Sequence, residues 1–133
     1  MSYTAKKNKL YYNGSEIYEA PTDITEIFND TDNDRAFIIY RGRNLLPDDY
    51  HDIMNPMLKD KELQKLINQN VLCIDKAGNI FWRIESTLDY PEAHERFINN
   101  HPGVRQLWVY RGDAREFMVD PQNGKILAWR MGL

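Results

Sequence analysis

The sequence predicts one α+β domain, built on a mostly antiparallel sheet with three to four helices packed on one of its faces. Short β-rich segments recur in pairs separated by turn residues, which is typical of hairpins and therefore of antiparallel strands. Between them lie segments with apolar residues at helical spacing, but these are too few for a parallel doubly wound sheet. The length of 133 residues suits a single domain, residues 1–133, and a composition of 42% hydrophobic residues can supply its core.

The amino-terminal segment combines a polar tail with a hairpin. Residues 1–8 are polar and basic, and we expect them to form a flexible tail. The segments 10–12 and 15–18 then flank Asn13-Gly14, a dipeptide that readily takes the positive φ angles of a type I′ turn. A two-residue loop of this kind places Leu10 opposite Ile17.

A short helix is predicted after this hairpin. Ile24, Ile27 and Phe28 recur at helical spacing, and Asp23 with Glu26 has the form of a capping box. The turn formers of residues 29–34 end the helix. The β-rich run 35–41 then predicts a strand, which stops at Gly42.

Two helical pieces and a hairpin are predicted for the middle of the chain. Apolar residues between 50 and 58 share one helical face, with Pro56 expected to split the helix, and a second piece carries Leu63, Leu66 and Ile67. The segments 71–74 and 80–84 flank turn residues 75–79 and predict a hairpin.

The carboxy-terminal third is predicted to hold a third helical region and three strands. Asp89 and Glu92 form a second capping box, and Ala93 and Phe97 would face inward from the helix that follows. A strand is expected over 104–111. The segments 116–119 and 125–131 form the last hairpin, so that the predicted order is ββα-β-αα-ββα-β-ββ.

The chain also resembles itself at a distance of 70 residues. This shift aligns 24–42 with 94–112 without a gap, and both segments read helix, turn and strand. The hypothesis is an internal duplication of a ββαβ unit, covering 9–42 and 71–112, within one pseudo-symmetric domain. The identities could arise by chance, so the shared order of elements is the stronger argument. The matched pairs are Asn29/Asn99, Arg35/Arg105, Tyr40/Tyr110, Arg41/Arg111 and Gly42/Gly112.

Composition indicates the cellular compartment and limits the classes of partner. The formal net charge of -3 argues against nucleic acid as the main partner, because phosphate binding needs concentrated Lys and Arg. A single cysteine, Cys73, cannot form an intramolecular disulfide, which favours the cytoplasm. The longest apolar run, 36–40, is far shorter than a membrane span. We therefore expect a cytoplasmic protein that binds no membrane.

Metal and cofactor chemistry is not expected. The acidic turn around Asp30, Asp32 and Asp34 has the spacing that opens a calcium loop. However, Arg35 stands where such a loop needs Gly, and Arg41 stands where it needs its bidentate Glu. The histidines lack the spacing of metal-binding motifs, no catalytic motif is present, and we assign no catalytic residue, no metal site and no cofactor.

The leading functional hypothesis is a non-enzymatic protein-binding module, monomeric or homodimeric, with one protein partner. Its most concrete form is an inhibitor, or an immunity or antitoxin-type protein, that neutralises a toxin enzyme such as a nuclease, because acidic inhibitors are steered onto basic active sites. The acidic turn and the Tyr-Arg strand ends are the predicted contacts. The candidate partner-binding residues are Asp30, Asp32, Asp34, Tyr40, Arg41, Tyr110 and Arg111.

Two alternatives belong to other classes. The first is a small enzyme whose site assembles from dispersed residues, such as His51 or His94 with nearby acids and Arg41 or Arg111. The second is a single-stranded nucleic-acid binder that uses an open sheet face. Its motivation is the recurrence of aromatic-arginine pairs at predicted strand ends, namely Tyr40-Arg41, Trp82-Arg83, Tyr110-Arg111 and Trp129-Arg130.

Overall fold

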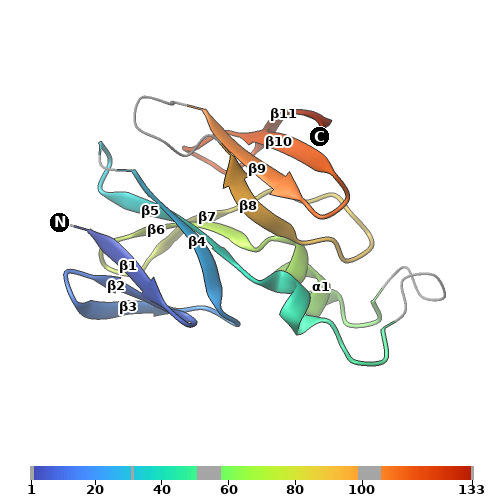
Figure 1. The fold of residues 1–133 in the computed structure, drawn as a ribbon, viewed down its shortest axis with the longest axis horizontal. Helices are drawn as coiled ribbons and strands as arrows, with labels where there is room; N and C mark the ends of the chain where they lie inside the picture. The colour runs from blue at the N-terminus through green and yellow to red at the C-terminus, as the bar shows by residue number, and fades with distance from the viewer. Residues whose placement is uncertain (1, 31, 51–57, 99–105, 133) are drawn as a thin grey trace.

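A computed structural model describes residues 2–30, 32–50, 58–98 and 106–132, and their strands form three antiparallel sheets (Figure 1). The N-terminal sheet contains β1 (Tyr3–Lys6), β2 (Lys9–Tyr12) and β3 (Ser15–Glu19) in that order. The middle sheet contains β4 (Ile24–Asp30), β5 (Arg35–Tyr40), β6 (Val71–Asp75) and β7 (Ile80–Arg83). The C-terminal sheet contains β8 (His94–Ile98), β9 (Leu107–Arg111), β10 (Arg115–Val119) and β11 (Ile126–Met131).

The middle sheet is covered on both faces. Every residue of β5 is buried, because Ile38 and Tyr40 pack toward the N-terminal sheet while Phe37 and Ile39 pack toward the C-terminal sheet. This explains why the run is apolar without alternation. A second core cluster joins β5, β6 and β7 to β8, β9 and β10, so the two four-stranded sheets pack face to face.

The prediction of three to four helices on one sheet face is wrong. The described residues contain one α-helix, α1 (Lys61–Asn68), and one 3₁₀-helix, η1 (Gly42–Leu45), and both lie at one end of the sheets (Figure 1). The predicted helical piece around residues 63–67 is confirmed as α1, whose N-cap Asp60 accepts a hydrogen bond from the Leu63 amide at 3.1 Å. Of the helical face predicted between residues 50 and 58, residues 51–57 lie outside the described residues. In the described part of the chain, no helix has the length and apolar character needed to cross a bilayer.

The helix predicted around Ile24 and Ile27 is instead β4, and a β-bulge explains the error. The register of β4 against β5 shifts between Ile24 and Glu26, so Thr25 is an extra, unpaired residue. Ile24 and Ile27 consequently share the face toward the N-terminal sheet although they are three positions apart. A spacing of three on one face looks helical in the sequence.

The helix predicted around Ala93 and Phe97 is instead strand β8, which begins after Ala93 and also contains a bulge. The register against β9 shifts between His94 and Arg96, which leaves Glu95 as the bulge residue. His94 and Phe97 therefore both face the core, three positions apart, where His94 meets Phe117 edge-on at 5.8 Å. Because both predicted helices are strands, the predicted ββαβ repeat unit is wrong.

The hairpins were predicted more accurately. Asn13 and Gly14 have φ angles of 49° and 85°, as the type I′ turn requires, and the hairpins β6–β7 and β10–β11 are confirmed. Leu10, however, pairs with Tyr18 and not with Ile17, because the register shifts next to it.

The start of the chain is more ordered than a flexible tail. We predict such a tail for residues 1–8, whereas residues 3–6 form β1 and Tyr3 is 5% exposed. The Tyr3 hydroxyl donates a hydrogen bond to the carbonyl of Asp34 at 2.6 Å. Burial raises the pKa of Tyr3 to about 12.

The middle and C-terminal sheets have the same topology, since each is a meander of four consecutive strands. The alignment by 70 residues matches β4 with β8 and β5 with β9. Ile39 and its match Val109 both face the core shared by the two sheets. Ile24 faces away from that core, whereas its match His94 faces toward it. Duplication therefore stays a hypothesis, and the shift of 70 residues relates only the first two strands of each meander.

Candidate functional site

The acidic turn is partly neutralised by its surroundings. Asp30 is half-buried and pairs with the Arg35 guanidinium, with 3.5 Å between Oδ2 and Nη2. Asp34 pairs with Lys76 at 3.5 Å, and Asp32 is exposed. The structure thus brings the three aspartates together at the β4–β5 turn, while Asp32 and Asp34 offer the more accessible carboxylates.

Two of the predicted partner-binding residues lie in the interior. Tyr40 is fully buried, its hydroxyl donates to the Leu66 carbonyl, and burial raises its pKa to about 12. Arg111 is 6% exposed, makes two hydrogen bonds to Asp113 at 2.9 and 2.7 Å, and lies over the Phe117 ring. We leave Tyr40 and Arg111 out of the candidate surface, because their side chains are already occupied inside the fold.

Tyr110 and Arg41 lie on different faces. Tyr110 is half-buried on the outer face of the C-terminal sheet, where the Arg96 guanidinium lies 4.2 Å from its ring centre. On the same face Arg130 lies 4.1 Å from the ring centre of Trp108. These rings are covered by guanidinium groups of the same chain, which leaves little open aromatic surface for stacking bases. Arg41 is exposed and lines a cleft with Arg96, beside β8.

Of the groups named for an enzymatic site, His94 and Arg41 line one cleft together with the acid Glu95. His94 is 3% exposed, and burial together with the Arg111 charge lowers its pKa to about 3. Cys73 is buried, which raises the pKa of its thiol to about 12. The described residues contain no cluster of three or more metal-ligating side chains. His51 and His101 lie outside these residues.

The exposed large hydrophobic side chains of the described residues all lie on two strands. Ile80 and Phe81 belong to β7, and Leu127, Trp129 and Met131 belong to β11. Each strand ends its sheet and has no described strand on its outer side. Edge strands usually carry charges or proline to prevent pairing with other chains, so exposed apolar residues there indicate an interaction surface.

The apolar surface on β11, formed by Leu127, Trp129 and Met131, is the candidate functional site. These side chains are 58%, 56% and 61% exposed and occupy alternate positions along the strand. Residues two apart share a face, so the three can be contacted together. Of the β11 residues, Ile126 packs against the core between the sheets.

The backbone of β11 is oriented for pairing with a further strand. The Gly132 amide donates to the Ala114 carbonyl at 2.7 Å, so the backbone of Gly132 faces β10. Because alternate residues of an antiparallel strand direct their backbone groups to opposite sides, Trp129 and Met131 direct theirs away from β10. The apolar side chains and the outward-facing backbone groups therefore belong to the same residues.

Basic side chains surround this apolar surface. The Arg115 guanidinium lies 5.0 Å from the ring centre of Trp129, and Lys125 precedes the strand. Arg130 points to the opposite face of the strand, where it lies over Trp108 with its Nε 2.7 Å from the carboxylate of Glu116. The surroundings favour a ligand that combines apolar and acidic groups.

Sequence reasoning identified the β11 strand but missed its surface. The signal was present, since apolar residues alternate from Leu127 to Met131, but such alternation normally indicates a face buried in the core. Whether that face is covered depends on where the middle sheet ends, which the sequence of β11 does not contain.

These features define an all-β protein in which two four-strand meanders pack face to face and a small third sheet covers one of them. The chain belongs to the family described as Domain of unknown function (DUF7957), whose model matches residues 49–131. The match includes α1 and β6 to β11, and therefore the whole apolar surface on β11. Comparisons with curated proteins and with solved structures gave no match.

Proposed function

We propose that this protein is a non-enzymatic protein-binding module that takes up an extended segment of its partner along β11. The observation that carries this proposal is the coincidence of exposed apolar side chains and outward-facing backbone groups at Trp129 and Met131. An extended peptide added to a sheet edge gains affinity from main-chain hydrogen bonds and specificity from side-chain contacts.

The partner segment should alternate apolar and acidic residues. Apolar side chains would cover Leu127, Trp129 and Met131, while acidic ones, which point to the other face of an added strand, would meet the half-exposed Arg130. Burying a Trp and two long aliphatic side chains removes enough apolar area to support binding. Edge charges would contribute mainly to the rate of association.

The more specific form of the proposal is an inhibitor or immunity-type protein in the cytoplasm. Its support is the net charge of -3 and the exposed carboxylates of Asp32 and Asp34, which suit encounter with a basic enzyme surface. In that form β11 holds the partner and the acidic turn accelerates its approach.

The test is the binding of a synthetic peptide of about eight residues that alternates Glu and Val, because such a peptide can pair as a strand. Amide resonances followed by NMR should shift at β11, and a Lys/Val peptide of equal length should bind more weakly. Trp129→Ala should weaken binding about tenfold through lost apolar contact. Phe81→Ala is the matched control, because Phe81 is equally exposed but lies on β7.

A backbone substitution separates strand pairing from simple apolar contact. Met131→Pro removes an outward-facing N–H without breaking a bond to β10, so it should reduce peptide binding more than Met131→Ala does. Equal binding by both variants would show that the peptide does not pair with β11. Peptide-induced shifts confined to other strands, or shifts unchanged in Trp129→Ala, would overturn the proposed site.

A further inference from the structure

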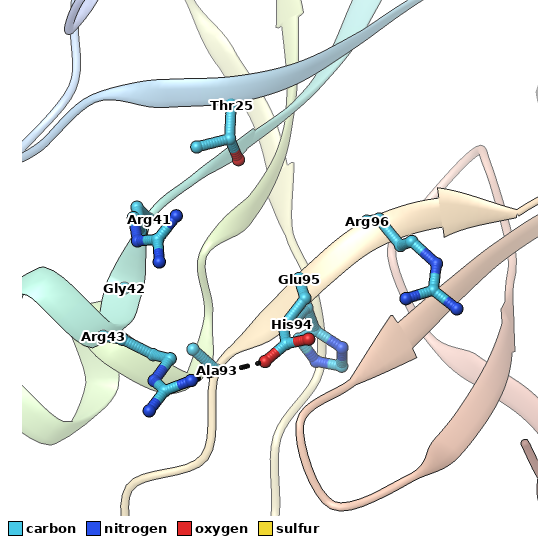
Figure 2. A pocket seen from close by; sticks show the side chains of 8 residues that line it. All are labelled: Thr25, Arg41, Gly42, Arg43, Ala93, His94, Glu95 and Arg96. Atoms are coloured by element: carbon cyan, nitrogen blue, oxygen red, sulfur yellow. Dashed lines mark ion pairs between the residues drawn. The ribbon is translucent and has the colours of Figure 1, made fainter.

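A cleft lies at the seam between β4 and β8, the two edge strands on the side opposite to β7 and β11. Its volume is about 360 Å³, which suits a small organic molecule. Figure 2 shows the side chains that surround it. The lining residues are Thr25, Arg41, Gly42, Arg43, Ala93, His94, Glu95 and Arg96.

Two β-bulges open this seam. Thr25 is the bulge residue of β4 and Glu95 is the bulge residue of β8, and both line the cleft. A bulge bends its strand and redirects a side chain, and such features are concentrated at sheet edges and functional sites. Beyond the cleft the two strands are joined, because the Glu26 carboxylate accepts a hydrogen bond from the Phe97 amide at 3.2 Å.

The inner wall of the cleft is kept free of side chains. A Cβ on Gly42 would lie 2.7 Å from the Ile67 carbonyl oxygen and 3.0 Å from Ala93 Cβ, so a glycine is needed for this close approach. Ala93 contributes a methyl group on the other side. The wall of the cleft at Gly42 and Ala93 is therefore tightly packed and carries no charge.

The charges of the cleft are unbalanced. Arg41 and Arg43 come from the end of β5 and the start of η1, and Glu95 faces them from β8 (Figure 2). Arg43 Nη1 lies 3.8 Å from Glu95 Oε1, a long ion pair between well-exposed groups. Arg41 has no ion pair or side-chain hydrogen bond within the described ranges. Arg96 turns away and covers Tyr110.

We propose that this cleft binds a small organic oxyanion, with Arg41 and Arg43 as its ligands. Paired guanidinium groups suit the planar oxygens of carboxylates and the oxygens of phosphates. The long contact between Arg43 and Glu95 shows that a carboxylate fits beside this arginine, and Glu95 acts as a counter-charge that an incoming anion displaces. The site is independent of the apolar surface on β11.

The experiment is a titration of the purified chain with inorganic phosphate and, separately, with citrate at low ionic strength, followed by NMR. Saturable shifts should appear at the bulges of β4 and β8, and the tighter anion identifies the class of ligand. Arg41→Gln should weaken binding about tenfold, as expected for a lost charge-assisted contact. Lys6→Gln is the control, since it removes the same charge from an exposed position on β1.

Glu95→Gln provides an opposite expectation, because removing the resident carboxylate should tighten anion binding. A structural role for Glu95 alone would predict unchanged or weaker binding. The proposal is overturned if neither anion gives saturable shifts, or if Arg41→Gln and Lys6→Gln have the same effect. Thermal melts of the variants verify that each one is folded.

Discussion

The Asn70 side chain is hydrogen-bonded to the backbone of His94 at both ends of its amide group. Nδ2 donates to the His94 carbonyl at 2.7 Å, and Oδ1 accepts from the His94 amide at 3.0 Å. Nδ2 also donates to the Tyr40 carbonyl at 2.7 Å. The side chain therefore replaces a peptide group of a neighbouring strand and joins the middle sheet to the start of β8.

Asn70→Ala should destabilise the protein strongly. Asn70 is completely buried, and its removal leaves the His94 amide and two carbonyl groups without partners. We expect a loss of about 3 kcal/mol in the free energy of unfolding, measured by urea denaturation. Asn33→Ala is the control, because Asn33 makes an exposed bond to Asp30 and its loss should cost about 0.5 kcal/mol or less. A similar small loss for Asn70→Ala would contradict the bridging role.

His94 should make stability depend on pH. Its pKa in the folded state is lowered from 6.5 to about 3, so the unfolded chain binds a proton between these values that the folded chain does not. The free energy of unfolding should therefore fall as the pH is lowered from about 6.5 toward 3, by up to about 1.4 kcal/mol per pH unit. Asp75 and Asp113 have lowered pKa values and add losses only below their unfolded value of 3.8.

The control for this pH dependence is His94→Phe, which keeps a ring against Phe117 and has no titrating group. The difference between the wild-type and variant pH profiles isolates His94, because all other groups titrate in both proteins. The profiles should diverge below about pH 6.5. Parallel profiles, or an NMR titration of the His94 ring near 6.5 in the folded protein, would refute the prediction.

Gly124 should be more sensitive to substitution than Gly14. Both have positive φ, +77° and +85°, so an alanine at either position is strained. A Cβ on Gly124 would lie 2.5 Å from Trp82, whereas nothing lies within 4 Å of one on Gly14. Gly124→Ala should therefore lose about 1–3 kcal/mol more than Gly14→Ala in urea denaturation. Equal losses would show that the contact between Trp82 and the β10–β11 turn is loose.

The acidic turn should act on association more than on folding. Replacing Asp32 and Asp34 by Asn removes exposed charge and one exposed ion pair, so stability should change little. Binding to a confirmed protein partner should become slower and less dependent on salt. Trp129→Ala should instead accelerate dissociation. Unchanged association rates at low salt for the Asp variant would remove the acidic turn from the interface.

Local turn chemistry and two-residue periodicity account for what was predictable. Asn13-Gly14 specifies its own turn through positive φ, and Asp60 specifies the start of α1 through a hydrogen bond three residues away. The bulges at Thr25 and Glu95 were not predictable from periodicity, because one extra residue in a strand turns a spacing of two into a spacing of three. The bulge at Thr25 was therefore mistaken for a helix, whereas β8 was mistaken for one on the capping-box pattern of Asp89 and Glu92.

The sequence by itself determined the hairpins, α1 and the buried strand β5, because each depends on contacts or periodicities between residues close along the chain. The tertiary structure alone decided which faces are covered. Tyr40 and Arg111 were predicted as contacts but lie inside, since the N-terminal sheet packs over Tyr40 and Arg111 is held against Asp113 and Phe117. Leu127, Trp129 and Met131 have the pattern of a buried face but remain exposed, since β11 extends past the shared core. Whether a strand face is buried depends on how far the neighbouring sheet extends over it, and the sequence of that strand does not contain this information.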